Sequence, residues 1–116
     1  MQLNHLNLTV TDVSVAKGFL ETYFGLRSMG DGNINMSGLF DDNGFTLILM
    51  RGGKAAEVIY PEGFHIGFTQ ANEGQVDAIN QRLRDDGFDV PPPRRLHGSW
   101  AFYFQAPGGF MIEVSA

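Results

Sequence analysis

The chain opens with alternating apolar and polar positions. Within residues 2–10 every second side chain from Leu6 onward is apolar, which is the pattern of a strand with one buried face. From Val13 to Phe24 apolar side chains instead recur every three or four positions, and Gly25 suits a left-handed helix stop. The pattern predicts a strand followed by a helix.

Three more strands are predicted before the middle of the chain, because short apolar runs alternate with turn-forming residues. Asp31 with Gly32, and the run from Asp41 to Gly44, supply the turn chemistry. The first half of the chain is therefore expected to consist of a strand, a helix and three strands. The three strands are predicted over residues 26–29, 33–40 and 45–50.

The second half repeats this order of elements. Asn72 with Gln75 three positions later indicates a capped helix, and Gly87 closes it as Gly25 closes the first. We expect one domain of two modules, because 116 residues can bury one core but leave no room for two independent domains. The strands of the second half are predicted over residues 64–70, 88–90, 94–96, 100–104 and 110–114. The predicted modules cover residues 1–53 and 63–116, with a connector over 54–62.

Composition narrows the chemistry of this domain. The 116 residues contain no cysteine, so any metal must be bound by imidazole or oxygen ligands. The net charge of −5 and the scattered basic residues argue against a nucleic-acid partner, which needs a concentrated basic face. No long apolar run or leader-like segment is present, so we expect a cytoplasmic protein with no membrane partner.

Three motifs carry a resemblance to a known family. They are the opening His5–Val10, the central Phe64–Phe68 and the closing Phe102–Glu113. Together they resemble the vicinal-oxygen-chelate superfamily, which includes glyoxalase, bleomycin-resistance and extradiol-dioxygenase proteins. The resemblance implies an α+β fold of two βαβββ modules whose curved mixed sheets form a cup.

The resemblance also implies a metal site. The matching ligand positions hold His5, His65 and Glu113, while the fourth position used by glyoxalase-type members holds Ile48. Strand alternation places all three candidate ligands opposite their apolar neighbours. Two imidazoles and a carboxylate suit a divalent ion, namely Fe²⁺, Mn²⁺, Zn²⁺ or Ni²⁺, and leave positions open for substrate oxygens. A single histidine on a strand is more often structural, so the hypothesis depends on the three acting together.

Two further residues are candidate catalytic groups. Tyr103 lies ten positions before Glu113 and could donate a hydrogen bond to a bound oxygen, although a core tyrosine is the alternative. His97 gives the order His, Tyr, Glu that resembles the extradiol dioxygenase signature, with a spacing that is one residue short. An exposed loop position is the alternative interpretation of His97.

Candidate substrate-binding residues come from both halves of the chain. The Arg94 and Arg95 pair follows three prolines and could bind a carboxylate or phosphonate, although such pairs are often solvated surface residues. The polar residues that share the face of His5 could hydrogen-bond a substrate. The candidates are Asn7, Thr9, Arg94, Arg95 and Trp100.

Two functional hypotheses follow from these residues. The first is a metal-dependent enzyme acting on a small oxygenated molecule: a dioxygenase, a lyase or isomerase, or an antibiotic-resistance transferase of the fosfomycin type. The second is a metal-free drug-binding protein of the bleomycin-resistance type, with an aromatic surface formed by Trp100, Phe102, Phe104 and Phe110. The resemblance also implies a homodimer.

Overall fold

The computed structural model describes residues 1–52 and 57–116. The chain divides into two compact units: Met1–Tyr60 with Ala106–Gly109 forms unit 1, and Pro61–Gln105 with Phe110–Ala116 forms unit 2. Each unit is described by itself. The start of the predicted connector, residues 54–56, lies outside the described residues.

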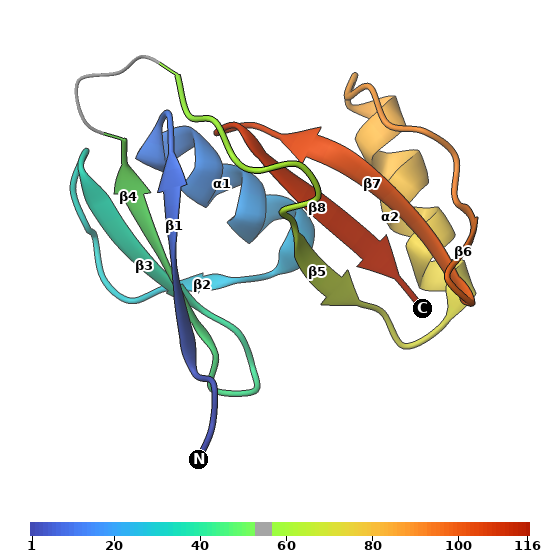
Figure 1. Ribbon diagram of the computed structural model, residues 1–116, viewed down its shortest axis with the longest axis horizontal. Coiled ribbons are helices and arrows are strands. Elements are labelled where there is room, and N and C mark those ends of the chain that lie inside the picture. Colours follow the sequence, from blue (N-terminus) through green and yellow to red (C-terminus); the bar gives the residue numbers. More distant parts are fainter. Residues whose placement is uncertain (53–56) are drawn as a thin grey trace. The chain divides into compact units, whose positions relative to one another are not determined.

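Unit 1 contains one helix and a four-stranded mixed sheet. The sheet has the order β1-β4-β3-β2, with β1 parallel to β4 and the other pairs antiparallel (Figure 1). Each residue of β1 has a partner on β4 in this parallel pair, and His5 lies opposite Thr46. The elements are β1 (His5–Val10), α1 (Val13–Phe24), β2 (Arg27–Ser28), β3 (Met36–Phe40) and β4 (Thr46–Arg51).

The ends of α1 show why the sequence breaks there. The side chain of Asp12 accepts a hydrogen bond from the backbone N–H of Val15 at 3.1 Å, which satisfies one of the free donors of the first turn. Gly25 ends the helix with a φ of 67°, a left-handed conformation that a residue with a Cβ adopts at a cost. The helix therefore ends where the sequence predicts.

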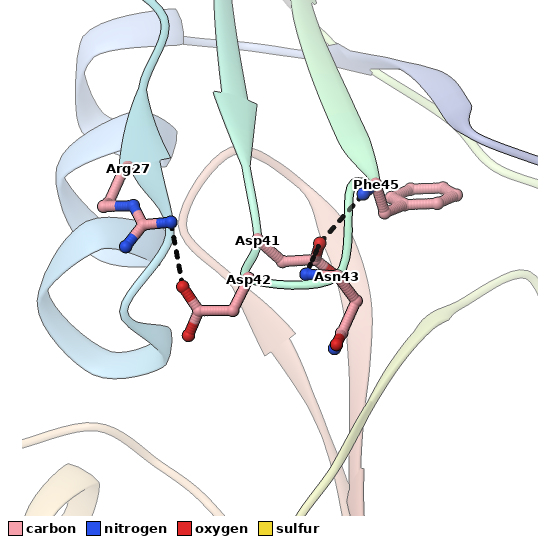
Figure 2. A network of polar contacts seen from close by, with 5 residues as sticks. All are labelled: Arg27, Asp41, Asp42, Asn43 and Phe45. Carbon is pink, nitrogen blue, oxygen red and sulfur yellow. Dashed lines mark hydrogen bonds and ion pairs between the residues drawn. The ribbon is translucent and has the colours of Figure 1, made fainter.

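The turn between β3 and β4 fixes their register. Figure 2 shows that the Asp41 carboxylate accepts hydrogen bonds from the backbone N–H groups of Asn43 and Phe45, each at 2.9 Å. Arg27 on β2 pairs with Asp42 of the same turn at 2.8 Å, although both side chains are mostly exposed. The aspartate hydrogen bonds are therefore the main local determinant, since an exposed ion pair contributes little.

Unit 2 repeats the architecture. Its sheet has the order β5-β8-β7-β6, with β5 parallel to β8 and β6 antiparallel to β7. Asn72 caps the helix by accepting from the N–H of Gln75 at 3.0 Å. The elements are β5 (Ile66–Thr69), α2 (Glu73–Asp85), β6 (Arg94–Leu96), β7 (Ser99–Ala106) and β8 (Phe110–Ser115). The predicted order of elements is confirmed in both halves.

One predicted strand, residues 88–90, is wrong. The N–H of Phe88 bonds to the carbonyl of Leu83 at 2.9 Å, so this segment completes the end of α2 instead of pairing with a strand. The three prolines that follow carry no N–H and could not extend a strand ladder. The predicted strand at 33–40 also begins late, at Met36, because Asn33 forms a turn by accepting two backbone N–H bonds.

Alternation along the strands gives each sheet a buried face and an open face. Burying a leucine or phenylalanine side chain contributes about 1.5–3 kcal/mol, so the buried rows hold each unit together. The strand side chains on the other side of each sheet form the open face of that unit. The strand residues of the buried face are Leu8, Val10, Leu39, Leu47 and Leu49 in unit 1, and Phe102, Phe104, Phe110, Ile112 and Val114 in unit 2.

No helix within the described ranges is long and apolar enough to cross a membrane.

Candidate metal and substrate site

A histidine and a glutamate meet on the open face of unit 2. The parallel register of β5 and β8 sets Gly67 opposite Glu113, and His65 lies two residues before Gly67 on the same side of the strand. The Nε2 atom of His65 is 3.1 Å from Oε2 of Glu113, and their side chains are 36% and 22% exposed. Two of the three predicted ligands are therefore adjacent.

Backbone contact fixes which nitrogen of His65 faces Glu113. Its Nδ1 lies 2.8 Å from the carbonyl oxygen of Gly63. A carbonyl oxygen only accepts, so Nδ1 carries the hydrogen of this bond. Nε2 therefore faces the carboxylate: it donates to Glu113 in an ion pair when the ring is protonated, and in the neutral ring it has a lone pair that a metal ion could accept.

Tyr103 on β7 completes the group. Its hydroxyl donates to Oε2 of Glu113 at 2.7 Å, and its ring meets the His65 ring edge-on with centroids 5.1 Å apart. The hydrogen bond to Glu113 raises the pKa of the Tyr103 hydroxyl, with burial and the negative carboxylate acting in the same direction. Tyr103 therefore keeps its proton at neutral pH and is a hydrogen-bond donor on the open face.

His5 lies on the open face of unit 1. Its Nδ1 is 2.8 Å from the side-chain oxygen of Asn4, so Nε2 is again the nitrogen left for another partner. Asn7 follows on the same face and donates to the sulfur of Met50, while Ile48 lies opposite Asn7 in the register. The carboxylate position that glyoxalase-type members use is apolar here.

Thr9 at the end of β1 is held through its backbone, and the candidate ligands do not gather into one group among the described residues. The carbonyl of Thr9 accepts a hydrogen bond from the hydroxyl of Tyr60, which fixes the backbone at the end of β1. Within residues 1–52 and 57–116, no three histidine, aspartate or glutamate side chains gather into a group that could hold a metal. The closest arrangement in unit 2 is the pair of His65 and Glu113.

The structure places His97 outside the group around Glu113. His97 and Gly98 form the turn between β6 and β7 with φ values of 50° and 83°, as expected for a tight hairpin turn. The four residue-to-residue steps from Ser99 to Tyr103 span about 13 Å of strand, and the His97 side chain is exposed. We do not retain His97 as a catalytic candidate.

The two arginines lie on opposite faces of β6. Arg94 is opposite Ala101 and Arg95 is opposite Trp100, so the pair is split by strand alternation. Arg95 pairs with Glu73 and lies over the Trp100 ring at 5.3 Å. Trp100 in turn donates its indole N–H to Asp77 of α2 at 2.8 Å. Arg95 and Trp100 are thus engaged on the helix side, and Arg94 alone shares the open face.

The aromatic surface considered for a drug-binding protein is not available in unit 2. Phe102, Phe104 and Phe110 are 1%, 4% and 1% exposed, respectively, because they pack on the buried face. That part of the second hypothesis is corrected: these rings are core residues, as aromatic side chains on strands commonly are.

Sequence reasoning missed two residues that support the site. Gly63 supplies the carbonyl that orients His65, and Asn80 on α2 donates to the carbonyl of Pro91 at 2.7 Å while only 3% exposed. A polar residue on the apolar side of a predicted helix is a signal for a role such as that of Asn80. No sequence signal marks a backbone carbonyl.

Comparison with known proteins shows the class to which this fold and site belong. The model of the Glyoxalase/Bleomycin resistance protein/Dioxygenase superfamily matches residues 2–114. The chain therefore belongs to this superfamily, which confirms the resemblance and the fold predicted from the sequence.

Particular relatives support the assignment. A possible glyoxalase from Bacillus cereus is 51% identical, with a TM-score of 0.91 over 100% of this chain and 99% of the other. The uncharacterized protein PA2024 of Pseudomonas aeruginosa is 27% identical over 97% of this chain and 86% of its own length. An E126Q mutant of the fosfomycin resistance protein FosX from Listeria monocytogenes, complexed with Mn(II) and 1S,2S-dihydroxypropylphosphonic acid, is 24% identical, with a TM-score of 0.77 over 99% of this chain and 89% of its own.

Proposed function

We propose that the protein is a metal-dependent enzyme that binds a small oxygenated substrate on a divalent ion held by His65 and Glu113; the third ligand that the family resemblance implies, His5, stays a prediction from the sequence. The observation that carries the proposal is the 3.1 Å approach of His65 Nε2 to Glu113 Oε2, with Nδ1 of the same ring occupied by Gly63. The contact of His65 with Glu113 and its contact with Gly63 each occur in proteins without a metal. Together they match the orientation of ligands around one ion.

The donor set fits a divalent ion. Nitrogen and oxygen ligands bind such ions at about 2.0–2.2 Å, so two of them at right angles are about 3 Å apart. The His65 and Glu113 atoms have this separation. His5 is prepared in the same way, because Asn4 occupies its Nδ1. Two imidazoles and one carboxylate without a thiolate suit Fe²⁺, Mn²⁺, Zn²⁺ or Ni²⁺.

Bound at these residues, the ion would act as a Lewis acid that stabilises negative charge on substrate oxygens. The chain's own contribution is to orient and donate. The hydrogen bond to Glu113 raises the pKa of Tyr103, so its hydroxyl holds its proton more tightly and can be shared with a substrate oxygen beside that carboxylate. Gly63 holds the His65 ring in place.

The likeness to FosX supports a metal-dependent member of this class, because the E126Q mutant of that protein is complexed with Mn(II). The lack of a carboxylate at Ile48 separates this chain from glyoxalase-type members with four ligands. The reaction proposed is resistance-type group transfer on a small oxygenated molecule, with dioxygenase and lyase or isomerase chemistry as the alternatives. The homodimer stays a prediction. It is supported by β1 and β5, which are edge strands of their sheets, because an unpaired edge can pair with another chain.

Elemental analysis tests the proposal. Protein purified without chelators or a metal-affinity column is reconstituted anaerobically with each of the four ions, beside His5→Ala, His65→Ala and Glu113→Ala. We expect about one ion per site in the parent. Each variant lacks one direct ligand, so its affinity for the ion should fall about a hundredfold or more. His97→Ala, which removes an exposed turn imidazole, is the matched control and keeps the metal.

Two results would contradict the proposal. One is a parent protein that takes up none of the four ions. The other is a metal content that does not change in the His65 and Glu113 variants, which would place the ion elsewhere. Either result favours the metal-free binding protein as the function.

A further inference from the structure

Unit 2 contains a pocket of 410 Å³ on the open face beside β6 and β7. The pocket adjoins the group around Glu113, because Tyr103 both lines it and donates its hydroxyl to that carboxylate. Arg94 is the one charged side chain of the lining. The apolar part of the wall includes Pro91, Pro92, Leu96 and Ala101.

Arg94 and Arg95 differ in whether their charge is already satisfied. Arg95 pairs with Glu73 and lies over Trp100 on the helix side of β6. Arg94 is exposed on the open face and has no ion pair with any described residue. The pocket therefore offers one guanidinium that is free to bind an anion.

The wall that carries Arg94 is held in place by the core. Asn80 of α2, 3% exposed, donates to the carbonyl of Pro91 at 2.7 Å, and the prolines that follow restrict the backbone up to Arg94. Removing this hydrogen bond would leave a buried amide and a carbonyl unpaired, which is costly. The backbone at Arg94 is thus held in place before a ligand arrives, which lowers the backbone entropy lost on binding.

We infer that this pocket binds the carboxylate end of the substrate, with Arg94 pairing with the carboxylate and the apolar wall covering a short hydrocarbon body. The inference rests on the proposed function only for the other end of the substrate, whose oxygens would lie at His65 and Glu113. It makes Arg94 a specificity-determining residue and assigns Arg95 to the packing of α2 against β6.

Charge and shape favour a carboxylate over a phosphate or phosphonate. A planar guanidinium offers two parallel N–H donors that match the two oxygens of a carboxylate. A dianion would call for a second cation, and the lining of the pocket contains only one. The net charge of −5 for the whole chain further disfavours a dianion.

Isothermal titration calorimetry with two matched probes tests the inference. The probes are 3-phenylpropionate and its neutral amide, 3-phenylpropanamide, which share the hydrocarbon body and differ in charge. Both are titrated into the full-length protein in EDTA, so that no metal contributes. We expect the acid to bind more tightly than the amide, and Arg94→Gln to weaken the acid about five- to tenfold, a moderate effect because the guanidinium is exposed.

Arg95→Gln is the matched control, since it removes the same charge one residue away. It leaves the affinity of both probes within about twofold, apart from a small general effect of charge that added salt removes. Arg94→Lys keeps the charge without the planar fork and is expected to recover part of the binding. Thermal melts of each variant verify that the fold is intact.

The inference is overturned if the acid and the amide bind equally, if neither binds, or if the two glutamine variants weaken the acid to the same extent. These outcomes are distinguishable from failure of the proposed function, because the titration contains no metal and elemental analysis contains no carboxylate probe. A protein that binds no metal and still shows the Arg94-dependent difference would retain the inference as a carboxylate-binding pocket alone.

Discussion

The two units place different chemistry on equivalent positions of their two sheets. In unit 1, His5 precedes Asn7 by two residues, and Asn7 lies opposite Ile48. In unit 2, His65 precedes Gly67 by two residues, and Gly67 lies opposite Glu113. Ile48 and Glu113 are therefore counterparts. The strand register is equivalent in both units. The side chain at this position, Ile48 or Glu113, determines whether the histidine has a carboxylate partner.

The pockets of the two units also differ in the charge of their lining residues. A pocket of 320 Å³ on the side of β3 and β4 in unit 1 has no charged residue in its lining, and Met29, Met36 and Ile48 contribute apolar side chains to it. The pocket of unit 2 is lined by Arg94 and Tyr103 beside Glu113. The charged lining residue lies in the pocket of unit 2, while the pocket of unit 1 is lined in part by methionine side chains, which are flexible and apolar.

The largest expected effect comes from giving unit 1 the carboxylate it lacks. Ile48→Glu places a glutamate at the position equivalent to Glu113, on the same face as His5. We expect Mn²⁺ to bind about tenfold more tightly, since a charged ligand is added at a site with a free imidazole nitrogen. Calorimetric titration measures the change. Ile48→Gln has the same length without the charge, and equal affinities for the two variants would show that the two positions are not equivalent.

A smaller effect is expected in the core of unit 1. Ser37 on β3 is 3% exposed and its hydroxyl has no hydrogen-bond partner among the described residues. Because an unsatisfied buried hydroxyl is costly, Ser37→Ala should raise the free energy of unfolding by about 1 kcal/mol. Urea denaturation measures it. Ser28→Ala is the control. The Ser28 hydroxyl donates to Glu21 at 3.2 Å, so removing it should not raise the free energy of unfolding. A destabilised Ser37→Ala would show that the hydroxyl is satisfied in solution.

The smallest effect concerns pH and belongs to unit 2 alone. The pKa of Tyr103 is raised in the folded state, chiefly by the hydrogen bond to Glu113, so this tyrosine holds its proton more tightly when folded. Its stabilising effect is complete below pH of about 10, the ordinary value, and is lost as the pH rises through the folded value. Urea midpoints at rising alkaline pH should therefore fall more steeply for the parent than for Glu113→Gln.

The control for the pH experiment is Tyr103→Phe, which removes the titrating group and should match the shallower slope. Tyr60, whose pKa is raised by burial, titrates in all three proteins and cancels in the comparison. Identical slopes for the parent and both variants would mean that the hydrogen bond from Tyr103 to Glu113 is absent in solution.

Most of the fold could be predicted because its determinants are local. Asp12 and Asn72 mark the helix starts, and alternation along β1 and β8 shows which side chains face away from the core. The segment 88–90 was mistaken for a strand because its apolar pattern is the same whether it pairs with a sheet or closes a helix. That choice depends on the carbonyl of Leu83, which no sequence pattern reveals.

The candidate site was predictable in part. The placement of His65 beside Glu113 follows from parallel pairing of two recognisable strands. The difference between Arg94 and Arg95 could not be predicted, because a three-residue strand after prolines has no periodicity of its own and takes its register from β7. The role of Asn80 depends on a contact with a loop eleven residues later, which is equally hidden in the sequence.

The environment of Trp100 makes unit 2 optically distinguishable from the rest of the chain. It is the only tryptophan of the sequence, and its indole is hydrogen-bonded to Asp77 and lies beneath Arg95. Its fluorescence emission therefore reports the melting of unit 2, whereas far-ultraviolet circular dichroism reports the helices of both units. If the two signals change at one denaturant concentration, the duplicated halves unfold cooperatively as a single domain; if they separate, each half is a folding unit of its own.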